Sequence, residues 1–373
     1  MAIYDIGFVL EQALGHITHA KNLQVNVPND PQVRAHWALV DFHVDGLASR
    51  VPIYKNNWTV RAGLRARHQL ALMTKQTNLD ALFFHTQVPA ILARSWLDKF
   101  PSIVSLDATP LQYDEFGGVY QHEKGPAWLE SLKWRLNRDC YKAARRIVAW
   151  AEWTKLGLVN AYEVPSEKVV VIPPGVNVSE WRRPAPREPL NRPAKILFVG
   201  GNFERKGGSN LLEAFRSLRD VGVELHLVTR DKIAVEKGLF VYNDMEPNSE
   251  PLKQLFHGCD IFALPTFGDS LPMVLSEASA SGMAIVSTKI AGIPEIVRHD
   301  ETGVLVPPGD TAALTNALRS LLASPDQRLT MGSRALAHVS KNFDAATNAQ
   351  RLLDLIKAEA DIAKFQRQKA AST

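Results

Sequence analysis

Short runs rich in Val, Ile, Leu and Phe recur along the whole chain, separated by longer stretches with helical spacing. The runs lie at residues 2–10, 36–41, 79–85, 102–107 and 146–150, and again at 195–200, 224–229, 260–265, 284–289 and 302–307. Unbroken apolar runs of this kind are typical of strands in a parallel sheet that helices cover on both faces. The alternation therefore predicts an α/β fold with two doubly wound parallel-sheet domains, one in each half.

The border between the two halves is marked by prolines. A proline-rich stretch at 182–193 forbids regular helix or central strand, and the segment before it, at 169–177, contains Pro173 and Pro174 followed by Gly175. We place the hinge there and expect an N-terminal domain at 1–173 and a C-terminal domain at 174–345. The helical pattern at 346–373 has no strand after it, and we expect this terminal helix to cross back onto the first domain.

Composition and charge limit the class of protein. The 373 residues are 46% hydrophobic and 22% charged, which argues against disorder, and the net charge of +4 suits anionic small molecules better than nucleic acid. Cys140 and Cys259 are too few and too far apart for a disulfide framework or a cysteine-based zinc site. The N-terminus lacks a basic leader and no run reaches the ~18 apolar residues of a membrane span. We therefore expect a cytoplasmic protein.

The first motif with a chemical meaning is a strand, a glycine-rich turn and a helix start at 195–210, KILFVGGNFERKGGSN. Glycines let backbone approach a ligand, and amides at a helix start attract anions. Arg205 and Lys206 add positive charge at the same place, so the motif predicts a phosphate site. The loop is neither a Walker A motif nor a dinucleotide fingerprint. The alternative is an ordinary turn with two solvated charges.

The second motif follows the run at 260–265 and has the sequence TFGDSLPMVLSEASASG at 266–282. Asp269 and Ser270 are good helix caps and Pro272 suits a first helical turn. The main chain that we expect to point at a ligand belongs to Leu271, Pro272, Met273 and Val274. Glu277 lies further along the helix, where a carboxylate can accept from two adjacent hydroxyls of a ribose. Asp269 would take a sugar hydroxyl, unless it is only a cap and Glu277 only a solvated side chain.

Together the two motifs resemble the donor-binding half of retaining GT-B glycosyltransferases, family 4 (glycosyl transferases group 1). That family has an acidic residue, seven intervening positions and a glutamate, here Asp269 to Glu277, after a glycine-rich loop with Arg and Lys, here Arg205 and Lys206. The resemblance covers the second half of the chain, and IPPGVN resembles the interdomain crossover. This chain departs from the family by having Asp269 in place of the commoner Glu, and Gly201 where an Arg is usual.

The first half resembles the family more weakly. Gly15 and His16 stand where the family has a glycine-rich loop that touches the donor phosphate and the acceptor. His85 and Asp107 each follow a predicted strand, and the carboxyl ends of such strands line the crevice of a doubly wound sheet, so we expect these residues to face Glu277 across a cleft. The two histidines could equally be hydrogen-bonded structural residues. A carboxylate such as Asp107 is costly to bury without a task or a cationic partner.

A basic helix is expected at 126–146. Its apolar positions at core spacing are Leu129, Leu132, Leu136, Cys140 and Ala143. Its basic residues are Lys133, Arg135, Arg138, Lys142, Arg145 and Arg146, and it carries Trp128 and Trp134. Basic residues beside interfacial tryptophans can lie on an anionic membrane. A solvated face of a packed helix is the alternative, and the one we favour.

The resemblance implies a glycosyltransferase that moves a sugar, a hexose in particular, from a UDP- or GDP-type nucleotide sugar to an acceptor hydroxyl, with retention. It makes Asp107, His85 and Lys206 the catalytic candidates and His16 and His85 the acceptor-binding ones. The donor-binding candidates are Gly15, Arg205, Lys206, Asp269, Leu271, Pro272, Met273, Val274 and Glu277. No metal or other cofactor is expected, since there is no DxD motif and the fixed cations would neutralise the leaving diphosphate.

Two other functions fit the same architecture. A nucleotide-sugar 2-epimerase would use the donor alone and would need its own acid and base. A non-catalytic nucleotide-sugar-binding subunit would be expected to have lost Lys206 and Glu277, which this chain keeps. The acceptor stays open between a lipid, a glycan and a small molecule, as does a peripheral contact with the inner face of a membrane.

Overall fold

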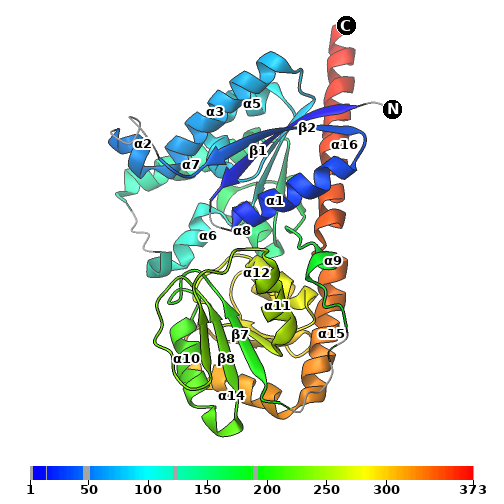
Figure 1. The fold of residues 1–373 in the computed structure, drawn as a ribbon. Helices are drawn as coiled ribbons and strands as arrows, with labels where there is room; N and C mark the ends of the chain where they lie inside the picture. Colours follow the sequence, from blue (N-terminus) through cyan, green and yellow to red (C-terminus); the bar gives the residue numbers. More distant parts are fainter. Residues whose placement is uncertain are drawn as a thin grey trace. The chain divides into compact units, whose positions relative to one another are not determined.

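The computed structural model describes residues 3–13, 15–44, 51–120, 125–185, 187 and 192–372. The chain divides into two compact units: unit 1 comprises Met1–Gln112, Glu123–Pro174 and Ala345–Thr373, and unit 2 comprises Tyr113–His122 and Gly175–Asp344. Each unit is built around one sheet of six strands, all parallel (Figure 1). The predicted α/β fold with two doubly wound sheets is confirmed.

Unit 1 has the strand order β2-β1-β3-β4-β5-β6. These strands are β1 (Tyr4–Gln12), β2 (Val33–Asp41), β3 (Ala81–Phe84), β4 (Ser102–Leu106), β5 (Arg146–Ala149) and β6 (Val169–Val171). Its helices are α1 (His16–Asn26), α2 (Pro52–Asn56), α3 (Trp58–Gln76), α4 (Gln87–Ala90), α5 (Arg94–Lys99), α7 (Ala127–Ala143), α8 (Glu152–Tyr162) and α16 (Ala345–Ala371), and α6 (Pro110–Glu115) runs from unit 1 into unit 2.

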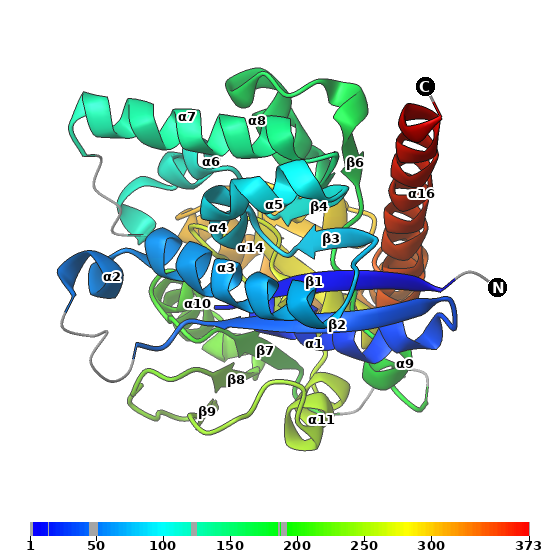
Figure 2. The same ribbon diagram turned by 90° about the horizontal axis from the view of Figure 1, so that it is seen from above.

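Side chains of β1 alternate between two separate cores, because successive residues of a strand point to opposite faces. Phe8 and its neighbours on one face pack with α1 and with Leu352 and Ile356 of α16. Val9 points to the other face, which is covered by α3, α4, α5, α7 and α8. The first and last helices of the unit thus share one face of the sheet, as Figure 2 shows for α1 and α16.

Unit 2 has the strand order β12-β11-β10-β7-β8-β9. Its strands are β7 (Lys195–Val199), β8 (Glu224–Val228), β9 (Leu239–Tyr242), β10 (Ile261–Leu264), β11 (Ala284–Thr288) and β12 (Gly303–Val306). Its helices are α9 (Val178–Trp181), α10 (Gly208–Arg216), α11 (Glu250–Gly258), α12 (Met273–Ala280), α13 (Ile293–Ile296), α14 (Thr311–Ala323) and α15 (Pro325–Asn342). Helix α10 packs on α14, and α12 packs on α15.

Two edge strands, β6 and β9, were not among the predicted apolar runs. The first lies at the start of the segment that we assigned to the interdomain connection. In the proline-rich stretch that follows, residues 186 and 188–191 lie outside the described part of the chain. Arg187, between them, donates to the main-chain oxygens of Phe256 at 2.6 Å and Ser281 at 3.2 Å, and so ties the stretch to unit 2.

Helix α7 buries only part of the predicted face: Cys140 is buried as predicted, but the two central leucines are not. Its buried residues are Asn137, Cys140 and Tyr141, whereas Leu132 and Leu136 are exposed together with Trp128. Aromatic packing sets this face, since Tyr141 contacts Tyr162 of α8 edge-on and Trp134 stacks on the same ring.

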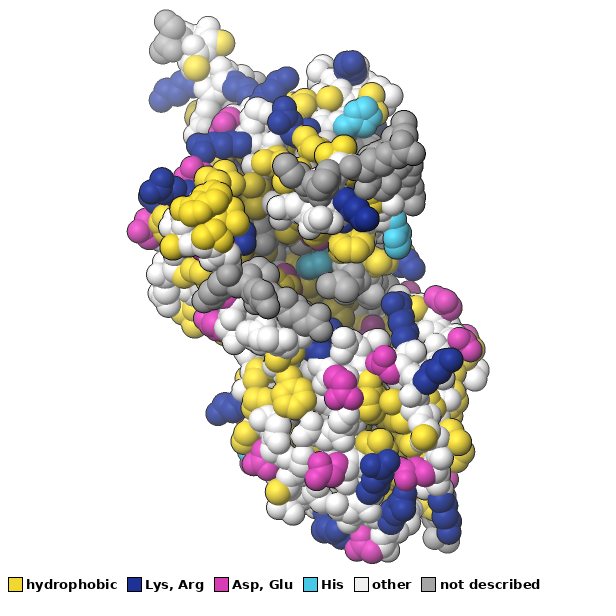
Figure 3. Space-filling model, turned by 90° about the vertical axis from the view of Figure 1, so that its left-hand side faces the viewer, with side chains coloured by type: hydrophobic (Ala, Val, Ile, Leu, Met, Phe, Trp, Pro, Cys, Tyr) yellow, Lys and Arg dark blue, Asp and Glu magenta, His cyan; other side chains and the backbone are white. Residues whose placement is uncertain are grey.

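The basic residues of this region are mostly neutralised within unit 1. The pairs are Lys133 with Glu130, Arg138 and Lys142 with Glu163, and Arg145 and Arg146 with Glu359. Among the described residues, only Arg135 of the six has no ion pair. On the face drawn in Figure 3, Lys and Arg side chains lie among Asp and Glu side chains. The charge basis for a membrane contact is therefore weaker than the sequence indicated. No described helix could cross a bilayer.

Candidate functional site

The predicted site residues follow strands that lie at the centre of each sheet. In unit 1 the strand order reverses between β1 and β3, and in unit 2 between β7 and β10. Open parallel sheets bind ligands outside the carboxyl ends of the strands at such a reversal. Each unit therefore has one expected ligand-binding edge, formed in unit 2 by the loops after β7 and β10.

Two cations and one carboxylate meet at this edge of unit 2. The Lys206 Nζ lies 2.7 Å from the Asp269 Oδ1, and the Arg205 Nη1 lies 3.1 Å from the same oxygen. Arg205 also donates to the Gly268 main-chain oxygen at 2.6 Å. The other carboxylate oxygen, Oδ2, accepts from the Thr266 hydroxyl at 2.7 Å. The cluster thus carries one more positive than negative charge and is held before any anion arrives.

Asp269 is ionised in this cluster. Burial by itself raises its pKa, but the charges of Lys206 and Arg205 and the hydrogen bonds from Lys206 and Thr266 together lower the pKa below its ordinary value. Lys206 keeps N–H groups that can still donate, because a lysine ammonium has three donors and the Asp269 carboxylate accepts from one of them. The lysine can therefore bind a phosphate without leaving Asp269.

The glycine-rich loop is shaped by a close approach to the end of β10. Gly207 has φ = +76°, and a Cβ on it would lie 1.9 Å from the Pro265 main-chain oxygen. Gly208, the first residue of α10, is packed against the Phe203 ring in the same way, with a Cβ distance of 2.3 Å. Main-chain hydrogen bonds join the two loops, since the Phe267 N–H donates to the Arg205 oxygen at 2.9 Å. Lys206 is therefore positioned by a turn that only glycine permits.

Helix α12 begins later than predicted. Its first residue is Met273 and its cap is Pro272, with no side-chain cap, so Asp269 and Ser270 do not cap it. Leu271 precedes the helix, and Pro272 has no N–H to offer. The free first-turn amides that can face an anion are those of Met273 and Val274. Asp269 precedes the cap Pro272 by three residues, and its carboxylate binds the two cations instead.

Glu277 lies on α12 as a half-buried carboxylate, and no described side chain hydrogen-bonds to it. Burial raises its pKa from an ordinary value of 4.5 to about 7, although the charge of Lys253 opposes the shift. The Lys253 ammonium is itself paired with Glu180 at 3.3 Å. An unsatisfied carboxylate of this kind is suited to accept hydroxyl groups from a ligand.

Glu277 should make the stability of the protein fall as the pH rises. Between about pH 4.5 and 7 the folded chain keeps a proton on Glu277 that the unfolded chain has lost, so ionisation opposes folding. We expect Glu277→Gln to raise the free energy of unfolding relative to wild type at pH 8 and to have little effect at pH 4.5. Urea unfolding at the two pH values measures the difference.

The matched control is Glu213→Gln, which changes an exposed carboxylate on α10 of the same unit. It should leave the pH profile of stability as it is in the wild type. If Glu277→Gln changes stability equally at both pH values, the carboxylate of Glu277 is not destabilised by burial.

The corresponding edge of unit 1 carries a histidine cluster. The His19 Nδ1 and the His85 Nε2 are 2.8 Å apart and share one hydrogen bond. The Trp150 ring packs against them, with centroids 4.9 Å from His19, 5.9 Å from His85 and 5.2 Å from His16. The Trp150 Nε1 donates to the Ser105 hydroxyl at 2.8 Å, which holds the ring in place. The cluster is thus a packed group rather than a set of free side chains.

His16 and Asp107 form the more accessible part of this edge. The His16 Nε2 lies 3.9 Å from the Asp107 Oδ1, and the His16 Nδ1 is buried with no hydrogen-bond partner among the described residues. The Asp107 main-chain oxygen accepts from the Thr154 hydroxyl, which fixes the backbone there. Gly15, which precedes α1, is exposed, and a Cβ on it would meet nothing within 4 Å.

The two deeper histidines are neutral at physiological pH. Burial, together with the nearby His16, lowers the pKa of His19 to about 3. Burial and the other two histidines lower the pKa of His85 well below its ordinary value. His85 is fully buried, so it contacts other side chains and not solvent. In this conformation His85 can affect a substrate only indirectly, through the side chains that it contacts.

Sequence reasoning missed His19 and Trp150. Trp150 directly follows β5, so the strand-end rule that selected His85 and Asp107 also applies to it. His19 is three residues after His16 on α1, and residues so spaced share a helix face. Nothing in the sequence marked Thr266, whose hydroxyl donates to Asp269, as a site residue except its place in the second motif. Among the described residues no group of three or more His, Cys, Asp or Glu side chains could hold a metal ion.

Two protein-family models together match most of the chain. The Glycosyltransferase Family 4 model matches residues 24–180, and the Glycosyl transferases group 1 model matches residues 193–324. The fold matches that of a sucrose-phosphate synthase from Thermosynechococcus elongatus with a TM-score of 0.75, over 99% of this chain and 100% of the other, at 15% sequence identity. The chain belongs to the GT-B glycosyltransferases.

Other known proteins are similar to this chain in sequence or in fold. A D-inositol 3-phosphate glycosyltransferase of Nocardia farcinica is 30% identical over 244 residues, which is 58% of this chain and 53% of that protein. The chain spans about half the length of several curated relatives that it matches. The Anabaena protein Alr3699/HepE, solved in complex with UDP, has a TM-score of 0.70 at 15% identity, over 95% of this chain and all of that one.

Proposed function

We propose that this chain transfers a sugar from a nucleoside-diphosphate sugar to an acceptor hydroxyl, with retention of configuration at the anomeric carbon. The observation that carries the proposal is the Arg205–Lys206–Asp269 cluster at the carboxyl edge of the central strands of unit 2. It has the charge and the position that a diphosphate requires. A solved neighbour of the same fold binds UDP, which supports a uridine nucleotide as the first one to test.

On the donor side, each described group has a distinct task. Lys206 and Arg205 neutralise the charge that develops on the leaving diphosphate, and the amides of Met273 and Val274 add two further donors. Glu277 accepts the ribose hydroxyls, for which it has a free carboxylate. Asp269 fixes the two cations, and its remaining lone pairs accept a hydroxyl of the sugar.

On the acceptor side, His16 and Asp107 bind the attacking hydroxyl, while His85 and His19 are positioning residues behind them. The bond between the anomeric carbon and the diphosphate oxygen breaks, and its electron pair stays with the diphosphate. The acceptor oxygen forms the new bond to the same face of that carbon, and its proton passes to the leaving phosphate. The total charge is conserved, because the leaving phosphate takes up the proton that the acceptor loses. The fixed cations stabilise the product diphosphate.

The two alternative functions lack a supporting observation. An epimerase needs both an acid and a base at the donor. Lys206 and Arg205 are each bound to Asp269, so Glu277 would have to supply both roles alone. A subunit without activity has no need of the Lys206 contact, which is present at 2.7 Å.

The proposal is tested by incubating the protein with a panel of UDP- and GDP-sugars and candidate acceptors. A nucleotide sugar that binds can first be found by thermal shift, because a ligand at 100 times its Kd adds ~2.7 kcal/mol of stability. We expect product with the anomeric configuration of the donor, by NMR, and equal rates with and without EDTA. An inverted product, or activity that EDTA abolishes and manganese restores, would contradict the proposed reaction course.

A further inference from the structure

A cavity of about 380 Å³ lies in unit 1 between β2, α2 and α3, apart from the histidine cluster. Its lining combines apolar and polar side chains: Leu39, Asp41, Tyr54, Leu64, Arg65, His68 and Gln69. Leu39 and Leu64 are each 44% exposed, so the cavity has two solvent-facing apolar groups at its wall. Its volume is at the lower end of the range for small-molecule sites.

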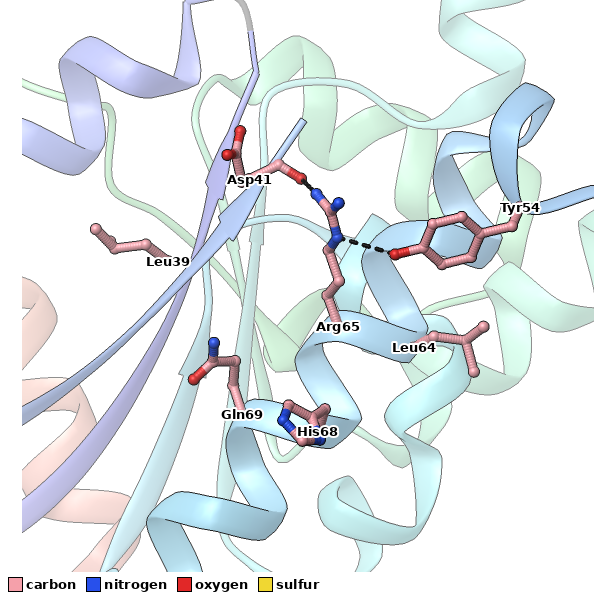
Figure 4. Close-up of a pocket in the computed structure, with 7 residues that line it drawn as sticks. All are labelled: Leu39, Asp41, Tyr54, Leu64, Arg65, His68 and Gln69. Atoms are coloured by element: carbon pink, nitrogen blue, oxygen red, sulfur yellow. Dashed lines mark hydrogen bonds between the residues drawn. The ribbon is translucent and has the colours of Figure 1, made fainter. Parts of the chain in front are cut away.

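Arg65 is held rigidly in this cavity, as Figure 4 shows. Its Nε donates to the Tyr54 hydroxyl at 3.1 Å, one terminal nitrogen donates to the Asp41 main-chain oxygen, and the other donates to the His43 oxygen at 2.7 Å. An arginine has five donors, so two N–H groups remain. The side chain of Asp41 points away from the guanidinium, and only its main-chain oxygen faces it.

The positive charge at this place is not neutralised by a described carboxylate. Arg65 forms no ion pair with any described residue, and neither does Arg61, one turn earlier on α3. Arg61 is buried and donates to the main-chain oxygens of Tyr54 at 2.9 Å and Lys55 at 2.8 Å. The same helix thus presents two guanidinium groups that are bound only to neutral oxygens. Such groups bind phosphate or carboxylate well, because their planar N–H pairs match two oxygens at once.

The cavity also lies beside the edge of the sheet where the acceptor is expected. Strand β2 pairs with β1 in a register that sets Asp41 opposite Gln12, and Gly15 and His16 follow shortly after Gln12 in the chain. The carboxyl ends of these two strands are therefore at the same edge. A ligand with one group in the cavity and another near His16 would lie along that edge.

We propose that the cavity is an acceptor subsite, an inference that rests on the proposed function. The acceptor then carries an anionic oxygen group, phosphate or carboxylate, which Arg65 binds. Leu39, Leu64 and the Tyr54 ring contact the apolar face of the molecule beside that group. His68 and Gln69 supply the hydrogen bonds that distinguish one acceptor from another. The chain would thereby select charged acceptors over neutral sugars.

The test is calorimetric titration of the full chain, without nucleotide, with three probes: glucose 6-phosphate, glucuronate and glucose. We expect at least one anionic probe to bind and glucose to bind at least tenfold more weakly. Gln69→Glu should weaken the anionic probe at least tenfold, because it adds a negative charge to the lining of the same cavity. The comparison between the two anionic probes tells whether phosphate or carboxylate is preferred. Arg65→Ala should cause the same loss by removing the guanidinium.

The controls are Gln76→Glu and Arg67→Ala, which make the same charge changes at exposed positions of α3 outside the cavity. Both should leave the titrations unchanged. Equal binding of all three probes, no binding of either anion, or a Gln69→Glu protein that binds like wild type would each overturn the assignment. Titration of the same preparations with UDP reports on unit 2 separately, so failure of the subsite is distinguishable from failure of the proposed function.

Discussion

Gly207→Ala should destabilise the protein by about 4 kcal/mol or more, a loss at the upper end of single substitutions. Alanine is strained at the φ of +76° that this residue adopts, and its Cβ would lie 1.9 Å from the Pro265 oxygen and 2.6 Å from the Pro265 carbonyl carbon. Both contacts are with backbone at the end of β10, so no side-chain rotation can relieve them. Urea unfolding followed by circular dichroism measures the loss.

Gly201→Ala is the matched control in the same loop. Nothing lies within 4 Å of a Cβ at Gly201, its φ is not in the left-handed region, and the residue is exposed. We expect that change to stay within about 0.5 kcal/mol of wild type. If the two variants were equally stable, the loops after β7 and β10 would not be in the close contact that positions Lys206.

The sheets were predictable wherever helices cover a strand on both faces. Such strands must be apolar at every position, as Phe198 and Phe262 are in unit 2, and the resulting runs stand out in the sequence. The two strands that escaped prediction are both at sheet edges. Strand β6 has three residues and is soon followed by Pro173, and in β9 Phe240 is 44% exposed. Both strands are apolar throughout, VVV in β6 and LFVY in β9, but runs of three and four residues are too short for periodicity to identify as strands.

The error in helix α7 has a different origin. Its sequence carries two adjacent stripes at helical spacing, one with Leu132 and Leu136 and one with Asn137 and Tyr141. Periodicity favours the leucines. The fold buries the other stripe because the rings of Tyr141 and Tyr162 pack together, and a contact between two helices cannot be inferred from the spacing within one of them.

The grouping of Arg205 and Lys206 was predictable because they lie in one local motif. Their pairing with Asp269 was not, since Lys206 and Asp269 are 63 positions apart and meet only because β7 and β10 are neighbours in the sheet. The same applies to His19 and His85, which are 66 positions apart. Residues that lie together in one loop can be grouped from the sequence, whereas pairings between loops depend on strand order.

Lys206→Ala should weaken binding of a nucleoside diphosphate by about 10- to 150-fold, the equivalent of 1.5 to 3 kcal/mol for one charge-assisted hydrogen bond. The loss comes from removing the ammonium itself and from leaving Asp269 with Arg205 alone, which cancels the net positive charge of the cluster. Isothermal calorimetry with UDP and GDP measures the affinity. The expected change is in the Kd for the nucleotide and not in the conformation of the loop, because the loop backbone is held by Gly207 and not by the lysine side chain.

Arg216→Ala is the control for this change. Arg216 ends α10 in the same unit, and the substitution removes a cation from an exposed ion pair with Glu236. It should leave the nucleotide affinity as it is, because surface pairs of this kind contribute little and lie outside the cluster. Asp269→Asn separates the two tasks of the carboxylate. It frees both cations, so the diphosphate should bind at least as well, while the nucleotide sugar loses a hydroxyl acceptor. If Lys206→Ala and Arg216→Ala bound UDP and GDP with equal affinity, the cluster would not be the diphosphate site.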